Sequence, residues 1–146
     1  MMNYIQSGVD EGANMLVGGE SDVPGYFIKP TVFENITPEM KISREEIFGP
    51  VLGIMPIKNA EEALRIASDT DYGLHATVFT QNIDQALHMA RSLPCGKVSV
   101  NGFSEGDIKT PFSGYKQSGS LARDNVTEAI EQYLQTKTIW VQTKSG

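Results

Sequence analysis

The chain has 146 residues, of which 40% are hydrophobic and 21% charged, a composition typical of a soluble globular protein. Its formal net charge of −6 disfavours nucleic acid and anionic membrane surfaces as partners. A single cysteine, Cys95, excludes an internal disulfide framework, and no apolar run is long enough to cross a bilayer. Because the N-terminus also lacks the regions of a signal peptide, we expect a cytoplasmic protein.

The N-terminal third of the chain predicts a helix and two strands. Apolar residues at four-residue spacing indicate a helix over residues 4–14, which two glycines weaken. No capping residue precedes this pattern, so we expect it to be a cut end of a longer protein. A short strand is expected at 15–17, and the β-rich run 26–33 contains Pro30, which favours an edge or irregular strand.

Residues 44–51 read Arg-Glu-Glu-Ile-Phe-Gly-Pro-Val and precede an apolar run, 51–57, that predicts a buried strand. Since Gly49-Pro50 interrupts regular structure, we expect Glu46 and Phe48 in a loop at the mouth of a sheet. A carboxylate there can accept hydrogen bonds from a ribose diol, and an aromatic ring can lie against a flat heterocycle. The alternative is a charged loop closed by a core phenylalanine.

The middle of the chain alternates strands with helices. Strands are expected at 51–57, 76–80 and 97–101, separated by helices that begin at the N-cap residues Asn59 and Asn82. This order with short loops predicts an α/β fold with a parallel sheet. Ligands of such sheets gather beyond the carboxyl ends of the strands, where the loop after 97–101 lies.

The C-terminal third holds a second glycine-punctuated stretch, residues 111–119, which excludes regular structure there. A helix is expected over 124–133 and an alternating strand over 137–141.

Few residues of this chain can carry chemistry by themselves. No two glycines are separated by one residue, which excludes a dinucleotide fingerprint and a Walker phosphate loop. His75 and His88 lie on separate elements without metal-ligand spacing, so no metal site is expected. Cys95 is the candidate thiol nucleophile, but no histidine lies at a fixed spacing to activate it, and a turn residue is the favoured interpretation. We therefore assign no catalytic residue.

Two motifs together resemble the signatures of the NAD(P)-dependent aldehyde dehydrogenase superfamily: Glu46-Ile47-Phe48-Gly49-Pro50 and residues 111–119, Pro-Phe-Ser-Gly-Tyr-Lys-Gln-Ser-Gly. Residues 71–74 and 98–101 also match in order and spacing, so the resemblance runs from about Tyr4 to Val141. It implies a truncated three-layer αβα, parallel-sheet subdomain from the C-terminal part of the catalytic domain. Residues 1–136 would belong to that domain, and 137–146 would form an oligomerisation strand and tail.

The resemblance implies a reaction and a cofactor, NAD or NADP. In the family a cysteine thiolate attacks the aldehyde, hydride passes to the nicotinamide, and water releases the carboxylic acid. Because the nucleophile, the general base and the dinucleotide-binding half precede the segment that this chain resembles, the chain alone is expected to be inactive. By position, Glu46 resembles the residue that binds the nicotinamide ribose, and Phe48 the aromatic beside the nicotinamide.

The resemblance also implies a substrate tunnel and a partner. Phe112 resembles an aromatic wall of the tunnel, and Phe103, Glu105 and Asp107 belong to its variable lip. The acidic lip looks like the branch that oxidises γ-glutamyl-aminobutyraldehyde or betaine aldehyde, since carboxylates favour cationic substrates. The strand from Lys137 to Val141 resembles the one that pairs with a neighbouring subunit, which implies a homo-oligomer.

Three positions depart from the family pattern: Ser113 replaces a glycine, residues 120–125 replace a shorter run, and His75 stands where a small residue is usual. Two other functions stay open. One is a free-standing, non-catalytic binding or assembly module with the same fold, and the other uses Cys95 as a relocated nucleophile.

Overall fold

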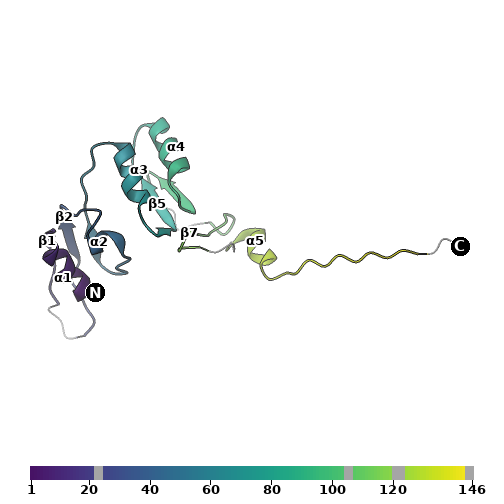
Figure 1. Ribbon diagram of the computed structural model, residues 1–146, viewed down its shortest axis with the longest axis horizontal. Helices are drawn as coiled ribbons and strands as arrows, with labels where there is room; N and C mark the ends of the chain where they lie inside the picture. The colour runs from purple at the N-terminus through teal and green to yellow at the C-terminus, as the bar shows by residue number, and fades with distance from the viewer. Residues whose placement is uncertain (22–24, 104–106, 120–123, 144–146) are drawn as a thin grey trace. The chain divides into compact units, whose positions relative to one another are not determined.

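The computed structural model describes residues 1–21, 25–103, 107–119 and 124–143 (Figure 1). The chain divides into two compact units, Met1–Ile66 and Ala67–Gly146, and each is described by itself. The expected boundary between residues 136 and 137 stays a prediction.

The first unit is built on a three-stranded sheet covered by helices. Its elements in chain order are α1 (Met2–Asp10), β1 (Asn14–Val17), β2 (Thr31–Glu34), α2 (Lys41–Arg44) and β3 (Val51–Gly53). Strand β2 is the middle strand, antiparallel to β1 and parallel to β3. The expected strand over 26–33 begins only after Pro30, which has no N–H to donate to a neighbour. The strand expected over 51–57 ends at Gly53, and the prediction that it is buried is wrong, since Leu52 is 58% exposed.

The core of the first unit surrounds Phe33, which is fully buried. Five further buried residues pack with it: Ile5, Ala13, Ile36, Met40 and Ile42. Gly8 allows helix α1 to approach this core, because an added Cβ would lie only 3.1 Å from the Phe33 ring. Gly12 adopts a positive φ of 92° just beyond the helix and ends it in a Schellman motif, with the Ala13 N–H donating to the Gly8 carbonyl. Both glycines that weaken the predicted helix therefore have structural roles.

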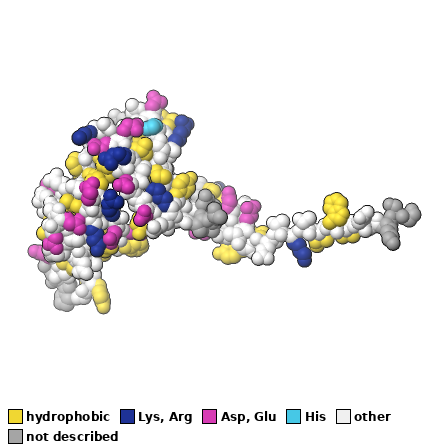
Figure 2. Space-filling view, in the orientation of Figure 1, with side chains coloured by type: hydrophobic (Ala, Val, Ile, Leu, Met, Phe, Trp, Pro, Cys, Tyr) yellow, Lys and Arg dark blue, Asp and Glu magenta, His cyan; other side chains and the backbone are white. Residues whose placement is uncertain are grey.

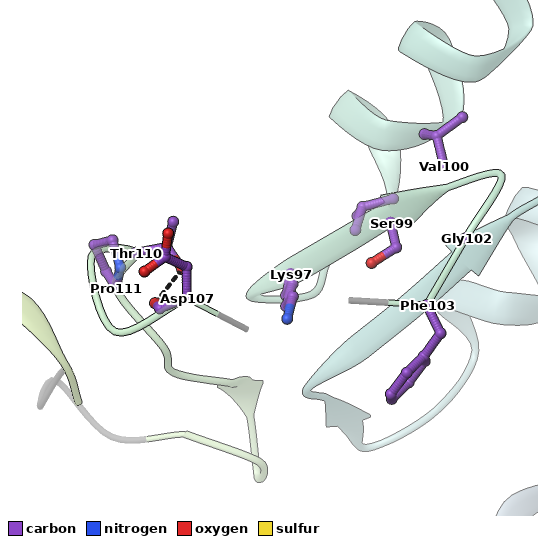
Figure 3. A pocket seen from close by; sticks show the side chains of 9 residues that line it. Lys97, Ser99, Val100, Gly102, Phe103, Asp107, Thr110 and Pro111 are labelled. Carbon is purple, nitrogen blue, oxygen red and sulfur yellow. Dashed lines mark hydrogen bonds between the residues drawn. The ribbon is translucent and has the colours of Figure 1, made fainter. Parts of the chain in front are cut away.

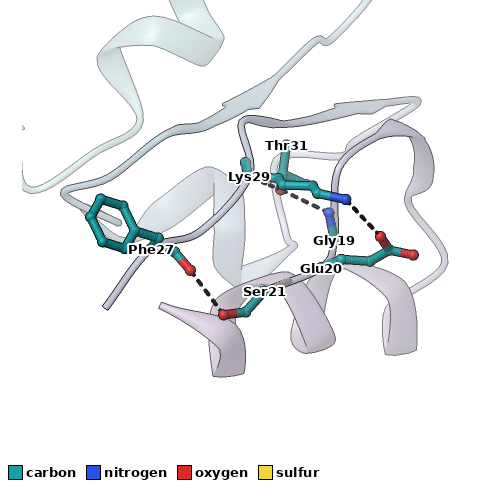
Figure 4. Close-up of polar contacts among 6 residues, drawn as sticks. All are labelled: Gly19, Glu20, Ser21, Phe27, Lys29 and Thr31. Carbon is teal, nitrogen blue, oxygen red and sulfur yellow. Dashed lines mark hydrogen bonds and ion pairs between the residues drawn. The ribbon is translucent and has the colours of Figure 1, made fainter. Parts of the chain in front are cut away.

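The start of β2 is held by polar contacts across the preceding loop (Figure 4). The buried Thr31 hydroxyl accepts from the Gly19 N–H at 3.0 Å and donates to the Lys29 carbonyl. Lys29 also forms an exposed ion pair with Glu20, 3.0 Å apart, which contributes little stability in water. The buried hydroxyl, whose partners satisfy it, is the stronger constraint on the strand position.

Both predicted helix starts are confirmed. Helix α3 (Ala60–Ser68) follows Asn59, whose Oδ1 accepts from the Glu62 N–H at 2.9 Å. Helix α4 (Ile83–Ser92) follows Asn82, whose Oδ1 accepts from two backbone N–H groups of the first turn.

The second unit holds two small sheets beside helix α4. Its strands are β4 (Tyr72–Gly73), β5 (His75–Val78), β6 (Lys97–Val100) and β7 (Tyr115–Lys116), and helix α5 (Val126–Glu131) follows them. Strands β5 and β6 are parallel, as expected for a strand–helix–strand unit, while β4 and β7 are antiparallel. The expectation of one parallel sheet through the strands at 51–57, 76–80 and 97–101 is wrong for the described residues, where β3 pairs with β2 and β5 pairs with β6 in a separate sheet.

The expected C-terminal strand over 137–141 is not formed within the single chain. Residues 134–143 belong to no helix or strand, and Trp140 is 89% exposed. Figure 2 shows hydrophobic side chains standing out along this segment. A strand requires a hydrogen-bonding neighbour, and the described part of the chain supplies none for it. Within that same described part, no helix combines the length and the apolarity needed to span a membrane.

Candidate functional site

The loop between α2 and β3 presents two side chains to solvent on either side of a partly buried isoleucine. Ile47 packs against the core of the first unit, whereas Glu46 and Phe48 are exposed, Phe48 by 88%. The prediction of a loop before a strand is confirmed, and the alternative of a core phenylalanine is wrong. The side chains of Glu46 and Phe48 are therefore exposed to solvent, while Ile47 between them anchors the loop to the core.

A second anchor fixes the start of this loop. The Tyr4 hydroxyl donates to Glu45 Oε2 at 2.8 Å, and Lys41 Nζ lies 3.9 Å from the same oxygen. The Lys41 ammonium also lies 5.1 Å from the centre of the Tyr4 ring, a cation–π contact. Glu45 is thus engaged with helices α1 and α2. Glu46, in contrast, makes no hydrogen bond or ion pair with any other residue that the structure describes.

The backbone at Phe48 is in the left-handed region, with φ of 54°. An L-residue with a Cβ is disfavoured there by about 1–2 kcal/mol, and burial of the ring does not offset this cost because the ring is exposed. Such outliers gather at functional positions, where the surrounding structure holds them. The two residues after Phe48 are held by backbone hydrogen bonds. The Val51 N–H donates to the Gly49 carbonyl, and the Thr31 N–H donates to the Pro50 carbonyl.

The second unit contains a pocket of about 430 Å³ at the end of β6 (Figure 3). Its lining residues are Lys97, Val98, Ser99, Val100, Gly102, Phe103, Asp107, Thr110 and Pro111. Two of the four predicted tunnel residues, Phe103 and Asp107, come together here, whereas Glu105 lies outside the described residues. Phe112 is not part of the lining, and its backbone forms a two-way bridge with Asp124 instead.

Three further polar residues in or beside this pocket, Lys97, Ser99 and His75, were not predicted as site residues. Ser99 is buried, with 9% of its surface exposed, and its Oγ lies 2.9 Å from His75 Nε2. The centre of the His75 ring lies 5.2 Å from the centre of the Phe103 ring. Lys97 lines the pocket as well. The signal was present in the sequence, because Lys97 and Ser99 alternate on one face of a strand whose end was expected to meet ligands.

Asn101 fixes the end of β6. Its side-chain amide donates to the Thr80 carbonyl at 2.8 Å and its Oδ1 accepts from the Thr80 N–H at 2.8 Å. These two hydrogen bonds hold the end of β6 against Thr80, directly after β5.

Residues 114–119, which we call the latch, form a closed turn tied to β4. Ser118 Oγ accepts from the Gly73 N–H at 3.1 Å, and the Gln117 N–H donates to the Asp71 carbonyl. The Lys116 ammonium donates to the carbonyls of Ser68 and Thr70 at 2.8 and 2.7 Å, at the C-terminal end of α3 where a cation is favoured. The latch thus uses its polar groups for structure.

Cys95 has the environment of a structural thiol. Its Sγ donates to the Lys97 carbonyl at 3.3 Å, and burial raises the pKa of the thiol, which lowers the thiolate fraction at neutral pH. Among the described residues, no three His, Cys, Asp or Glu side chains gather as a metal site would require.

Comparison with known proteins decides the family. The sequence profile described as the aldehyde dehydrogenase family matches residues 1–139. The chain belongs to the aldehyde dehydrogenase family. It is 46% identical over 140 residues to aldehyde dehydrogenase 1 of Tanacetum cinerariifolium, covering 95% of this chain and 28% of that protein. It is 44% identical over 144 residues to an aldehyde dehydrogenase of Enchytraeus buchholzi, covering 98% of this chain and 29% of that protein. The chain therefore spans less than a third of the length of these relatives.

Solved aldehyde dehydrogenases have the same fold. The indole-3-acetaldehyde dehydrogenase AldA of P. syringae, in a mutant form bound to NAD+ and IAA, superimposes with a TM-score of 0.91 at 41% identity, over 97% of this chain and 29% of that one. The NAD+ complex of an aldehyde dehydrogenase from Bacillus cereus gives 0.91 at 42% identity, over 98% of this chain and 29% of that one. The predicted α/β fold of an aldehyde dehydrogenase segment is confirmed.

Proposed function

We propose that the chain works as the C-terminal part of the catalytic domain of a longer, NAD(P)-dependent aldehyde dehydrogenase. Three observations support this: the family match, the share of under a third of each relative's length, and a thiol in Cys95 that is poorly suited to attack. The longer enzyme converts an aldehyde to a carboxylic acid through attack by a cysteine thiolate and hydrolysis of the resulting thioester. NAD or NADP accepts the hydride when bound.

Glu46 and Phe48 would hold the nicotinamide end of that cofactor. An exposed carboxylate without a hydrogen-bond or ion-pair partner among the described residues can accept two hydrogen bonds from a ribose diol, and an exposed ring can lie against the nicotinamide. The observation that carries this assignment is the packing of the partly buried Ile47 against the core, because it anchors the loop between two exposed side chains.

The assignment is tested by asking which half of the cofactor the chain recognises. Nicotinamide mononucleotide and AMP are titrated separately into the isotope-labelled chain, and the backbone amide shifts of the 45–51 loop are followed by NMR. We expect weak binding of the mononucleotide at that loop and no comparable effect of AMP, since the chain holds one end of the cofactor. Equal shifts with both ligands, or none with either, would remove the assignment.

The pocket of the second unit would contribute to the aldehyde site. Asp107 and the Phe103 ring favour a cationic or amine-bearing substrate such as betaine aldehyde or γ-glutamyl-aminobutyraldehyde, while Lys97 opposes this preference. Betaine aldehyde is compared with its neutral isostere, 3,3-dimethylbutanal, as substrates of the longer enzyme that contains this chain. A higher catalytic efficiency for betaine aldehyde is expected; equal efficiency at low salt would exclude the amine preference.

The segment from Lys137 to Val141 would pair with a second copy in a homo-oligomer. The apolar side chains of Ile139, Trp140 and Val141 are exposed on a segment that has no strand neighbour in the described chain. We expect concentration-dependent self-association in sedimentation velocity, whereas a monodisperse monomer at high concentration would contradict it. The composition further supports a cytoplasmic location, without nucleic acid or membrane as partner.

A non-catalytic binding or assembly module is the second candidate. It is favoured over a relocated nucleophile because the Cys95 thiol is hydrogen-bonded and its pKa is raised. The chain alone should therefore reduce no NAD+ when an aldehyde is added. Continuous coding sequence upstream of Met1 for the rest of the enzyme would favour the dehydrogenase, and its absence the module.

A further inference from the structure

His75 connects the buried wall of the pocket to its exposed rim. It is the first residue of β5 and lies opposite Lys97 of the parallel strand β6. Its Nε2 lies 2.9 Å from Ser99 Oγ, and Ser99 is buried in the pocket wall. Because a hydroxyl can donate or accept, this hydrogen bond forms with either tautomer of the imidazole. The bond satisfies a buried hydroxyl and fixes the position of the His75 ring at the same time.

The His75 ring also contacts the Phe103 ring. The two ring centroids are 5.2 Å apart and the planes are inclined by 54°, a favourable tilted geometry for an aromatic pair. Phe103 is 73% exposed, so few other contacts restrain it. Figure 3 shows Phe103 on one side of the pocket and the loop with Asp107 and Pro111 on the other. The orientation of the Phe103 ring therefore helps to define the opening between them.

We infer that His75 is a positioning residue that orients Phe103 at the rim of the pocket and so sets which ligands the pocket accepts. The inference rests on the proposed function, in which this pocket is part of the aldehyde site. A held ring can offer its face to an ammonium group opposite Asp107, whereas a freely rotating ring loses conformational entropy on every binding event.

The test uses choline, a non-reactive ammonium probe, with the full chain and a set of matched variants. His75→Ala removes both contacts, His75→Phe keeps a ring beside Phe103 without the hydrogen bond, and Ser99→Ala removes the hydrogen bond alone. His88→Ala is the control, since His88 lies exposed on α4. The readouts are the NMR shifts of the Phe103 ring protons, assigned with Phe103→Leu, and the choline affinity.

We expect His75→Ala to change the Phe103 ring shifts and to weaken choline binding about threefold to tenfold, the range for one aromatic pair. His75→Phe should restore most of the ring shift and affinity, and His88→Ala should change neither. Unchanged Phe103 shifts in His75→Ala would overturn the inference, and so would changed shifts with unchanged choline affinity. If His75→Ala loses amide dispersion, Ser99→Ala decides, because it removes the hydrogen bond that holds the His75 ring. Changed Phe103 ring shifts in Ser99→Ala would support the inference, and unchanged shifts would overturn it.

Failure of the inference and failure of the proposed function are distinguishable. The cofactor assignment is read from nicotinamide mononucleotide at the 45–51 loop of the first unit, whereas His75 is read from Phe103 in the second. Loss of the first result with the second intact removes the cofactor site and leaves the role of His75 in place.

Discussion

The 45–51 loop and the latch are the two signature stretches of this chain, and they use their side chains in opposite ways. In the loop, Ile47 and Glu45 are the anchors, and Glu46 and Phe48 stay exposed. In the latch, the Lys116 ammonium and the Ser118 hydroxyl bond to backbone groups of the same unit. The two stretches show that a sequence motif shared by a family can have a structural role, as in the latch, or can expose side chains to a ligand, as in the loop.

The largest expected effect lies in the latch. An added Cβ at Gly119 would collide with the Gly114 carbonyl, which is backbone and cannot turn aside. We expect Gly119→Ala to destabilise the chain by about 3 kcal/mol, measured by urea unfolding followed by circular dichroism. Gly102→Ala is the control, because no described heavy atom beyond its chain neighbours lies within 4 Å of its added Cβ, and it should change stability by less than about 0.5 kcal/mol. Equal stability of the two variants would mean that the latch is not closed.

An effect of intermediate size is expected at Phe48, where glycine should give a more stable chain than alanine. Glycine tolerates the φ of 54° there and alanine does not, and little burial is lost with either because the ring is exposed. We expect Phe48→Gly to be more stable than Phe48→Ala by about 1 kcal/mol in urea unfolding. The matched pair at Phe27, which is 69% exposed without a positive φ, should show the reverse order. If alanine is favoured at both positions, the backbone at Phe48 is not strained.

The smallest effect concerns the pH dependence of stability at Cys95. Burial raises the pKa of the folded thiol above its ordinary value, so the unfolded chain releases this proton first as pH rises. The contribution of Cys95 is therefore fully present below about pH 8.5, the ordinary range of a free thiol, and is lost as pH rises through the folded pKa. Urea unfolding between neutral pH and about pH 10 should show less alkaline destabilisation in Cys95→Ala than in the parent chain. An identical decline in both would exclude a contribution from this thiol.

The sequence predicted the structural features that are determined by residues close together in the chain. The side-chain oxygens of Asn59 and Asn82 cap the helices they were expected to begin, because capping is decided within four residues. Pro30 limited a β-rich run to the strand that follows it. The exposure of Glu46 and Phe48 before a strand also followed from the Gly-Pro turn.

Features that depend on distant partners were not predicted. The pairing of β3 with β2 requires knowledge of strand order, which alternating strands and helices do not give. The contact of His75 with Phe103 joins positions 28 residues apart (103 − 75), and no periodic pattern reports it. The tail strand has the right alternation, but a strand forms only where a neighbour is present.

The most direct test of the central claim compares Glu46→Gln with Glu45→Gln in titrations with nicotinamide mononucleotide. Glutamine at position 45 can still accept from the Tyr4 hydroxyl, so that variant keeps the loop anchored and controls for the loss of one charge. The account predicts that Glu46→Gln weakens binding about tenfold, as for a charge-assisted hydrogen bond replaced by a neutral one, while Glu45→Gln changes it by less than about threefold. Equal affinity of the Glu46→Gln variant and the parent chain would contradict the claim that Glu46 holds the nicotinamide sugar.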